Sequence, residues 1–244
     1  MEGIVIVLYK VLLLAGVFSS AYAGYAAYRL NPKGKANRIF LMAAVAVMFW
    51  NLDAFLRGMG FGADISELLI RSQISMGIIA GAGLLWLMQV FSKSEVPKPI
   101  AALPAAALVL LVVFTDTIIS GDAPQWYSYV GVEGPLIWIM QAYLVAAIAA
   151  SLAMARITWT QLGKRGRAYF MDISLIVFPV AILALIDGII FTAGIPFPTL
   201  SNAAVGPADL FAFYVFRKHS GEKARRGEKA TDGNGPVMAF FCAV

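Results

Sequence analysis

The apolar residues of this chain fall into seven long runs that are separated by short polar segments. A helix of roughly 20 apolar residues is long enough to cross the ~30 Å hydrocarbon core of a bilayer. The pattern therefore predicts an all-α membrane protein, a bundle of seven transmembrane helices within residues 1–217. The predicted spans are 4–28, 39–60, 68–91, 99–119, 134–155, 168–193 and 199–216. Residues 218–244, a charged and glycine-rich stretch, are expected to form a basic, disordered tail.

The charges of the connecting segments alternate along the chain. Segments 29–38 and 156–167 carry four basic residues each and no acidic residue. The charged residues of segments 61–67 and 116–133 are all acidic. Segment 92–98 has two lysines against one glutamate. Basic loops remain on the cytoplasmic side of a membrane. The pattern predicts an N-terminus outside the cell and a cytoplasmic C-terminus.

Residues 1–23 admit a second interpretation as a signal peptide, because Ala21-Tyr22-Ala23 resembles a cleavage site. However, Glu2 precedes the apolar core and the first basic residue is Lys10. Cleavage would also place the basic segment 29–38 outside the cell. A first transmembrane helix is the favoured interpretation.

Composition agrees with a membrane location. Hydrophobic residues make up 60% of the chain and charged residues 14%, against about 25% charged in soluble domains. The net charge of +5 resides in loops and tail, where it acts as a topology signal, so we expect no nucleic-acid partner. The lone cysteine, Cys242, excludes an intramolecular disulfide.

A few polar and aromatic side chains within the predicted spans converge on the outer half of the bundle. Trp50, Asp53 and Arg57 share one helical face, and Asp53 and Arg57 have the i, i+4 spacing of an ion pair. The full candidate ligand-binding set is Trp50, Asp53, Arg57, Arg71, Trp138, Gln141, Asp187 and Asn202. Two interpretations stay open: a ligand pocket in a mostly apolar cavity, or a structural network that fixes helix register.

Other residues suggest movement rather than catalysis. Pro179 and Pro207 interrupt the last two predicted spans, so they are candidate hinges or merely tolerated kinks. No motif of a metalloprotease, serine hydrolase, nucleotide-binding loop or metal cluster occurs. The seventh predicted span has no lysine for a retinal Schiff base. We therefore expect no enzyme activity, cofactor or metal.

Several short motifs carry a family resemblance over residues 4–217. They are Arg29-Leu30-Asn31-Pro32 with Asn37-Arg38, Trp50 with Asp53, Gly134-Pro135-Leu136-Ile137-Trp138 with Tyr143, and the prolines Pro179 and Pro207. In these places the chain resembles the N-terminal seven-transmembrane sensor region of certain bacterial and archaeal histidine kinases. The resemblance implies a signalling role in a prokaryotic plasma (inner) membrane. Kinases of this type continue into an ATP-binding domain, whereas about 27 residues follow Arg217 here. The expectation is a stand-alone sensor, a truncated product or a part that works through a partner.

Two functions follow as hypotheses. The first is a non-enzymatic sensor, in which a ligand or membrane state sensed in the outer half shifts the last two helices. It would signal to a cytoplasmic partner or through a homodimer, and membrane lipid is its other expected partner. The alternative is a small transporter of three, one and three spans, in which Asp53 and Asp187 occupy comparable positions. An enzyme that depends on Asp172 alone has too little support. The sequence does not identify the ligand.

Overall fold

The structure is a computed structural model of the chain. It describes residues 2–30, 32–91, 99–124, 129–161, 167, 171, 178–180, 182–190, 200–205, 208 and 211.

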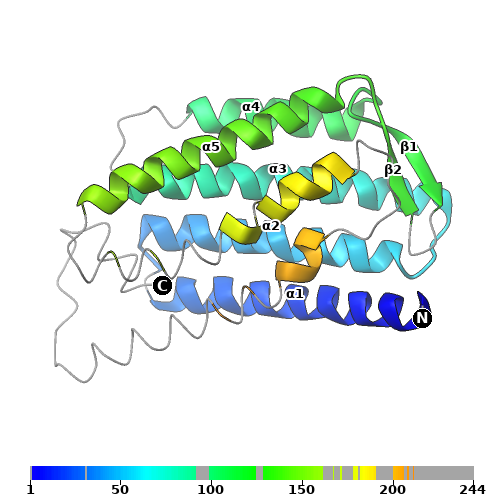
Figure 1. The fold of residues 1–244 in the computed structure, drawn as a ribbon, viewed down its shortest axis with the longest axis horizontal. Helices are drawn as coiled ribbons and strands as arrows, with labels where there is room; N and C mark the ends of the chain where they lie inside the picture. The colour runs from blue at the N-terminus through cyan, green and yellow to red at the C-terminus, as the bar shows by residue number, and fades with distance from the viewer. Residues whose placement is uncertain are drawn as a thin grey trace.

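Three long helices run side by side in alternating directions (Figure 1). They are α1 (Glu2–Leu30), α2 (Lys35–Arg57) and α3 (Ala63–Phe91). α1 ends just before Pro32, because a proline disfavours helical geometry in the residue before it and cannot supply the next backbone donor. The turn between α2 and α3 contains Gly60 at φ 81°, a conformation that glycine adopts without steric cost.

The chain then returns along the other side of α3. α4 (Pro99–Phe114) and α5 (Ile137–Gln161) both pack against α3, and an antiparallel hairpin connects them. The hairpin comprises β1 (Ile119–Pro124) and β2 (Tyr129–Glu133), with a register irregularity between Ile119 and Gly121. It lies at the end of the bundle where α3 begins (Figure 1). α3 thus contacts α2, α4, α5 and both strands, and it is the central helix of the described structure.

Two apolar clusters hold the helices together. One lies toward the hairpin end, where Ile70 and Ile78 of α3 meet Leu108 and Val112 of α4 and Met140 of α5. The other lies at the opposite end and is built around Ile39, Leu87, Met88 and Ala155, with Phe178 packed against it. Both are nearly free of solvent, so they position α3 against its neighbours at each end.

Small residues let the long helices approach one another closely. A Cβ at Gly24 of α1 would lie 2.8 Å from the Cβ of Ala44 in α2. A Cβ at Gly83 of α3 would lie 3.1 Å from the Cβ of Ala43. Close backbone approach through small residues is the usual packing mode of helices in membranes.

The described residues of the sixth and seventh predicted spans are helical at every position. They include an apolar helix, Phe178–Ile190, that extends across a short undescribed gap, and a helical segment at 200–205. Pro179 has helical conformation and is exposed. Pro207 and residues 218–244 lie outside the described residues, so the predicted hinge and tail at these positions are not described.

Within the described residues, four helices are long and apolar enough to cross a membrane: Gly3–Arg29, Asn37–Arg57, Asp64–Val90 and Ile137–Thr160. The protein is therefore mostly helical and compatible with a membrane protein, as the sequence predicted. The exposed surface of these helices is rich in large apolar side chains such as Ile4, Phe18 and Leu152. Such a surface is suited to lipid rather than to water.

Three details differ from the prediction. The described structure is not helical throughout, because the segment predicted as an outer loop contains the β1–β2 hairpin. The fourth helix was expected to reach residue 119 but ends at Phe114. Its last carbonyl groups are bound by side chains, and the apolar residues Ile118 and Ile119, which suggested a longer helix, are buried at the start of the hairpin instead. The fifth helix begins at Ile137, three residues later than predicted, and runs to Gln161.

The junction between the hairpin and α5 depends on a glycine. A Cβ at Gly134 would lie 2.5 Å from the carbonyl oxygens of Asp116 and Thr117. Gly134→Ala should therefore lower the free energy of unfolding by about 1–3 kcal/mol, the usual cost of overpacking. The midpoint of thermal unfolding in detergent measures it.

Gly77→Ala is the matched control, because a Cβ at Gly77 meets nothing within 4 Å. Alanine is favoured over glycine within a helix by about 1 kcal/mol, so this variant should be neutral or slightly stabilised. Equal destabilisation by both substitutions would contradict the packing described at Gly134.

Candidate functional site

A buried polar cluster lies between α2 and α3. Asp53, Arg57 and Gln73 are each at least 91% buried. The Arg57 guanidinium donates a hydrogen bond from Nη2 to Oε1 of Gln73. Ser72 hydrogen-bonds to the Asp53 carboxylate, which also lies in the field of the Arg57 charge. The shared face of Asp53 and Arg57, predicted from their spacing, thus points toward α3.

The Asp53 carboxylate is only partly satisfied. Its Oδ2 is buried and accepts no hydrogen bond within the described part of the chain. Buried carboxylate oxygens are normally satisfied, and in an apolar helical bundle an unsatisfied one is costly. The cluster therefore has unused capacity to accept a proton, a water molecule or a ligand donor.

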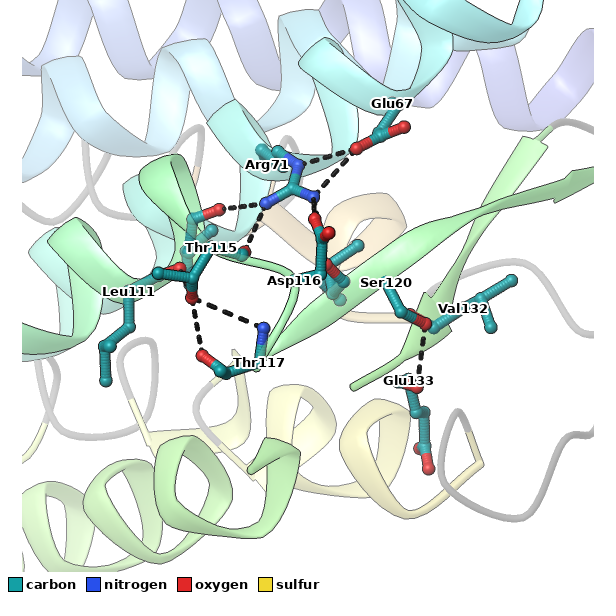
Figure 2. A network of polar contacts seen from close by, with 11 residues as sticks. Glu67, Arg71, Leu111, Thr115, Asp116, Thr117, Ser120, Val132 and Glu133 are labelled. Atoms are coloured by element: carbon teal, nitrogen blue, oxygen red, sulfur yellow. Dashed lines mark hydrogen bonds and ion pairs between the residues drawn. The ribbon is translucent and has the colours of Figure 1, made fainter. Parts of the chain in front are cut away.

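Arg71 forms a second network at the start of α3 (Figure 2). Its Nε donates to Glu67 at 2.9 Å, and Nη1 donates to the carbonyl oxygens of Val112 and Thr115 at 2.7 and 2.6 Å. Nη2 donates to Asp116 at 2.5 Å and to the carbonyl of Ile119 at 3.1 Å. A guanidinium carries five N–H donors, and these five bonds use all of them.

The Arg71 network closes the end of α4. The last carbonyl groups of a helix have no partners within the helix and carry partial negative charge, so a cation with several donors stabilises them. The Thr115 hydroxyl also donates to the carbonyl of Leu111 at 2.6 Å. Since every donor is used on the protein itself, the geometry favours the structural interpretation for Arg71 over a ligand-binding one.

Asp187 also binds within the protein. Its Oδ1 accepts a hydrogen bond from the backbone N–H of Leu200 at 2.7 Å. Its Oδ2 accepts bonds from the N–H and the hydroxyl of Ser201 at 2.7 and 2.5 Å. A carboxylate at the N-terminus of a helix satisfies unpaired donors and complements the helix dipole. Asp187 thus ties the 182–190 helix to the helical segment at 200–205.

The remaining candidates divide between the interior and the surface. Gln141 of α5 donates from Nε2 to the carbonyl of Gly188 at 3.4 Å, which links α5 to the 182–190 helix. Trp138 is 61% exposed, so its side chain does not enter the interior. That exposure suits an anchor at a membrane interface. Trp50 is half-buried on α2.

Asn202 is the most unusual of the candidates. It is completely buried, and neither its Oδ1 nor its Nδ2 has a hydrogen-bond partner among the described residues. An unpaired buried amide costs on the order of 1–3 kcal/mol. It directly follows Ser201, whose backbone N–H donates to Asp187, so it lies on the helical segment that Asp187 binds.

The eight predicted residues therefore form local groups. Asp53 and Arg57 belong to the α2–α3 cluster, while Gln141, Asp187 and Asn202 belong to the contacts of the last two helices. Sequence reasoning missed the partners that complete these groups: Ser72, Gln73, Thr115, Asp116 and Ser201. Gln73 was noticeable as a polar residue in an apolar run, but its pairing with Arg57 across two helices has no sequence signal. Within the described residues, no group of three potential metal ligands gathers.

Comparison of the sequence with models of known protein families and with curated proteins found no match. The assignment of a function therefore rests on the chemistry of the chain itself.

The Arg71 network yields a direct test. Arg71→Lys keeps the charge but loses the planar fork of donors, so carbonyls at the end of α4 lose their partners. We expect the free energy of unfolding to fall by about 1–3 kcal/mol, measured by thermal or chemical unfolding in detergent.

Asp116→Asn is the matched control. The Asp116 side chain is 79% exposed, and exposed ion pairs contribute at most about 1 kcal/mol. A larger loss in Asp116→Asn than in Arg71→Lys would show that the ion pair, and not the capping of α4, holds this end together.

Proposed function

We propose that the protein is an integral membrane sensor of seven spans, with its N-terminus outside and its C-terminus in the cytoplasm. It recognises a ligand or a membrane state in the outer half of the bundle. The last two helices relay the change to a cytoplasmic partner or to a second copy of the chain. The proposal takes up the predicted resemblance to histidine-kinase sensor regions.

The observation that carries the proposal is Asn202. A fully buried carboxamide whose two polar atoms have no partner among the described residues destabilises the protein unless something else binds it. Polar groups inside apolar helical bundles usually mark functional sites for this reason. A small polar ligand or ordered water that accepts from Nδ2 and donates to Oδ1 would relieve the cost.

The position of Asn202 supports transmission as well as binding. Asp187 joins the 182–190 helix to the segment that contains Asn202, and Gln141 joins the same helix to α5. A ligand that binds Asn202 and displaces its segment would therefore act on the 182–190 helix through Asp187, and on α5 through Gln141. The apolar helix that contains Asp187 also reaches the opposite end of the bundle, where Phe178 packs against α2, α3 and α5 residues. This continuity favours a relay along the last helices.

The charge distribution supports the orientation. Among the described residues, Asp64, Glu67, Asp116, Asp122 and Glu133 lie at the hairpin end. Basic residues such as Arg29, Lys33 and Arg38 lie at the other end. The positive-inside rule places the basic end in the cytoplasm.

The only cysteine provides a test of this orientation. A membrane-impermeant maleimide should label Cys242 only after the cells are permeabilised. As a control, Ser120→Cys in a Cys242→Ser background should be labelled in intact cells, since Ser120 is exposed in the hairpin. The reverse labelling pattern would overturn the proposed topology.

Asn202→Leu tests the proposed site. Replacing an unsatisfied buried amide by an apolar side chain of similar size should raise the free energy of unfolding, by about 1–3 kcal/mol. We expect at least one solute from a panel of amino acids, sugars and nucleosides to raise the unfolding midpoint of the wild type. The same solute should leave Asn202→Leu unchanged.

Asn37→Leu is the matched control, because Asn37 is equally buried but donates to the carbonyl of Ala27 at 2.6 Å. This variant should be destabilised rather than stabilised. If Asn202→Leu lost stability like Asn37→Leu and no solute shifted the wild type, Asn202 would be structural. Uptake of an active solute into proteoliposomes would instead support the transporter alternative.

A further inference from the structure

One exposed stripe of α1 changes character along its length. Val11, Phe18, Tyr22, Tyr25 and Arg29 follow one another at intervals of seven, four, three and four residues, which places them on one helical face. Phe18 is 69% exposed, Tyr22 53% and Tyr25 56%. The stripe is therefore open to its surroundings, and it passes from aliphatic to aromatic to cationic.

The length of the stripe matches one leaflet of a bilayer. Eleven residues separate Phe18 from Arg29, which is about 16 Å along a helix. That distance is about half of the ~30 Å hydrocarbon thickness. If Arg29 lies at the level of the headgroups, Phe18 lies near the centre of the bilayer. The two exposed tyrosines then fall toward the interface, the depth that tyrosine prefers.

The cationic end of the stripe is held in place by an aromatic ring. The guanidinium carbon of Arg29 lies 5.9 Å from the centroid of the Tyr25 ring, within cation–π distance. Among the described residues, the ion pairs within 4 Å are those of Arg71, so no described carboxylate neutralises Arg29. A guanidinium has donors arranged to bind phosphate oxygens in pairs.

The described residues around Arg29 favour an anionic partner, because they bring no negative charge of their own. The described residues at this end, 26–30, 32–42, 84–91, 99–104 and 150–161, contain no aspartate or glutamate. A second pair of the same kind lies at the end of α5, where the Arg167 guanidinium is 5.9 Å from the Trp159 ring and its Nε donates to the Trp159 carbonyl at 3.1 Å. α1 and α5 end on the same side of the bundle (Figure 1).

We propose that this stripe is a binding site for an anionic phospholipid of the cytoplasmic leaflet. An acyl chain lies along Val11 and Phe18, the tyrosines flank the glycerol region, and Arg29 binds the phosphate beside the Tyr25 ring. The inference depends on the membrane location but not on sensing or on Asn202, so either proposal can fail without the other.

The test uses the full chain, purified in neutral detergent and titrated with phosphatidylglycerol or with phosphatidylcholine of the same acyl chains. The unfolding midpoint reports binding. Phosphatidylglycerol should stabilise the wild type more strongly. In Arg29→Gln its apparent Kd should rise about fivefold, the effect expected for one cation at an anionic surface.

Three variants sharpen the result. Lys33→Gln removes the same charge in the turn just beyond α1, where no described aromatic ring lies over it, and should change the Kd by less than about twofold. Tyr25→Leu keeps the charge and should weaken binding about two- to fivefold through the lost cation–π contact. Arg29→Lys should recover part of the affinity lost in Arg29→Gln. Because these side chains are exposed, all four variants should fold, and their unfolding midpoints without lipid check that they do.

Three outcomes would overturn the proposal. Equal weakening by Arg29→Gln and Lys33→Gln would mean diffuse attraction to the basic end. Equal stabilisation by the two lipids would mean that no headgroup is selected. The same stabilisation by glycerol phosphate or inorganic phosphate would mean a site for free anions. Cross-linking of a photoactivatable phosphatidylglycerol to a peptide that spans Tyr22 to Leu30 would support the assigned position.

Discussion

The guanidinium of Arg71 is the interaction on which the hairpin end of this structure depends. It lies on α3, and its bonds reach the last turn of α4, the connecting residues and the first residue of β1. From there, the backbone N–H groups of Gly134 and Leu136 donate to the carbonyls of Ile118 and Thr117, which sets the start of α5. A chain of bonds thus leads from one side chain to three elements. Apolar packing is not directional, so by itself it would constrain much less how far these helices slide along one another.

Other polar side chains inside the bundle also bind partners within the protein. An apolar environment supplies no water to a buried polar group, so each group must find its partner within the protein or remain unsatisfied at a cost. Arg71 and Asp187 find their partners in the unpaired backbone groups at helix ends. Arg57 finds Gln73 on the neighbouring helix. Asp53 and Asn202 retain atoms without a described partner, and this difference separates structural groups from the candidates for binding.

The two ends of the bundle differ in chemistry. The hairpin end is acidic and is closed by a saturated network, whereas the opposite end is basic and presents aromatic rings beside exposed arginines. The apolar helix Phe178–Ile190 connects the two ends, packing near Trp159 at one and meeting Gln141 at the other. Because its two ends differ in charge, the protein would take one preferred orientation in a membrane, with its basic end toward anionic lipid.

The sequence by itself determined that the described chain is mostly helical and contains helices long and apolar enough to cross a membrane. Long apolar runs in a chain with 14% charged residues leave few alternatives, because the signals are local. Glu67 and Arg71 have the i, i+4 spacing of an ion pair, and the structure contains that pair. The shared face of Asp53 and Arg57 was predicted in the same way.

Only the tertiary structure decided what those side chains bind. The five acceptors around Arg71 come from residues up to 48 positions away, and Asp187 accepts a hydrogen bond from a backbone N–H 13 residues later. The hairpin between α4 and α5 was equally hidden, because Ile118 and Ile119 fit the end of an apolar helix as well as the start of a buried strand. Helical periodicity describes one segment at a time. Whether a polar group in that segment is satisfied depends on backbone atoms that distant parts of the chain bring to it.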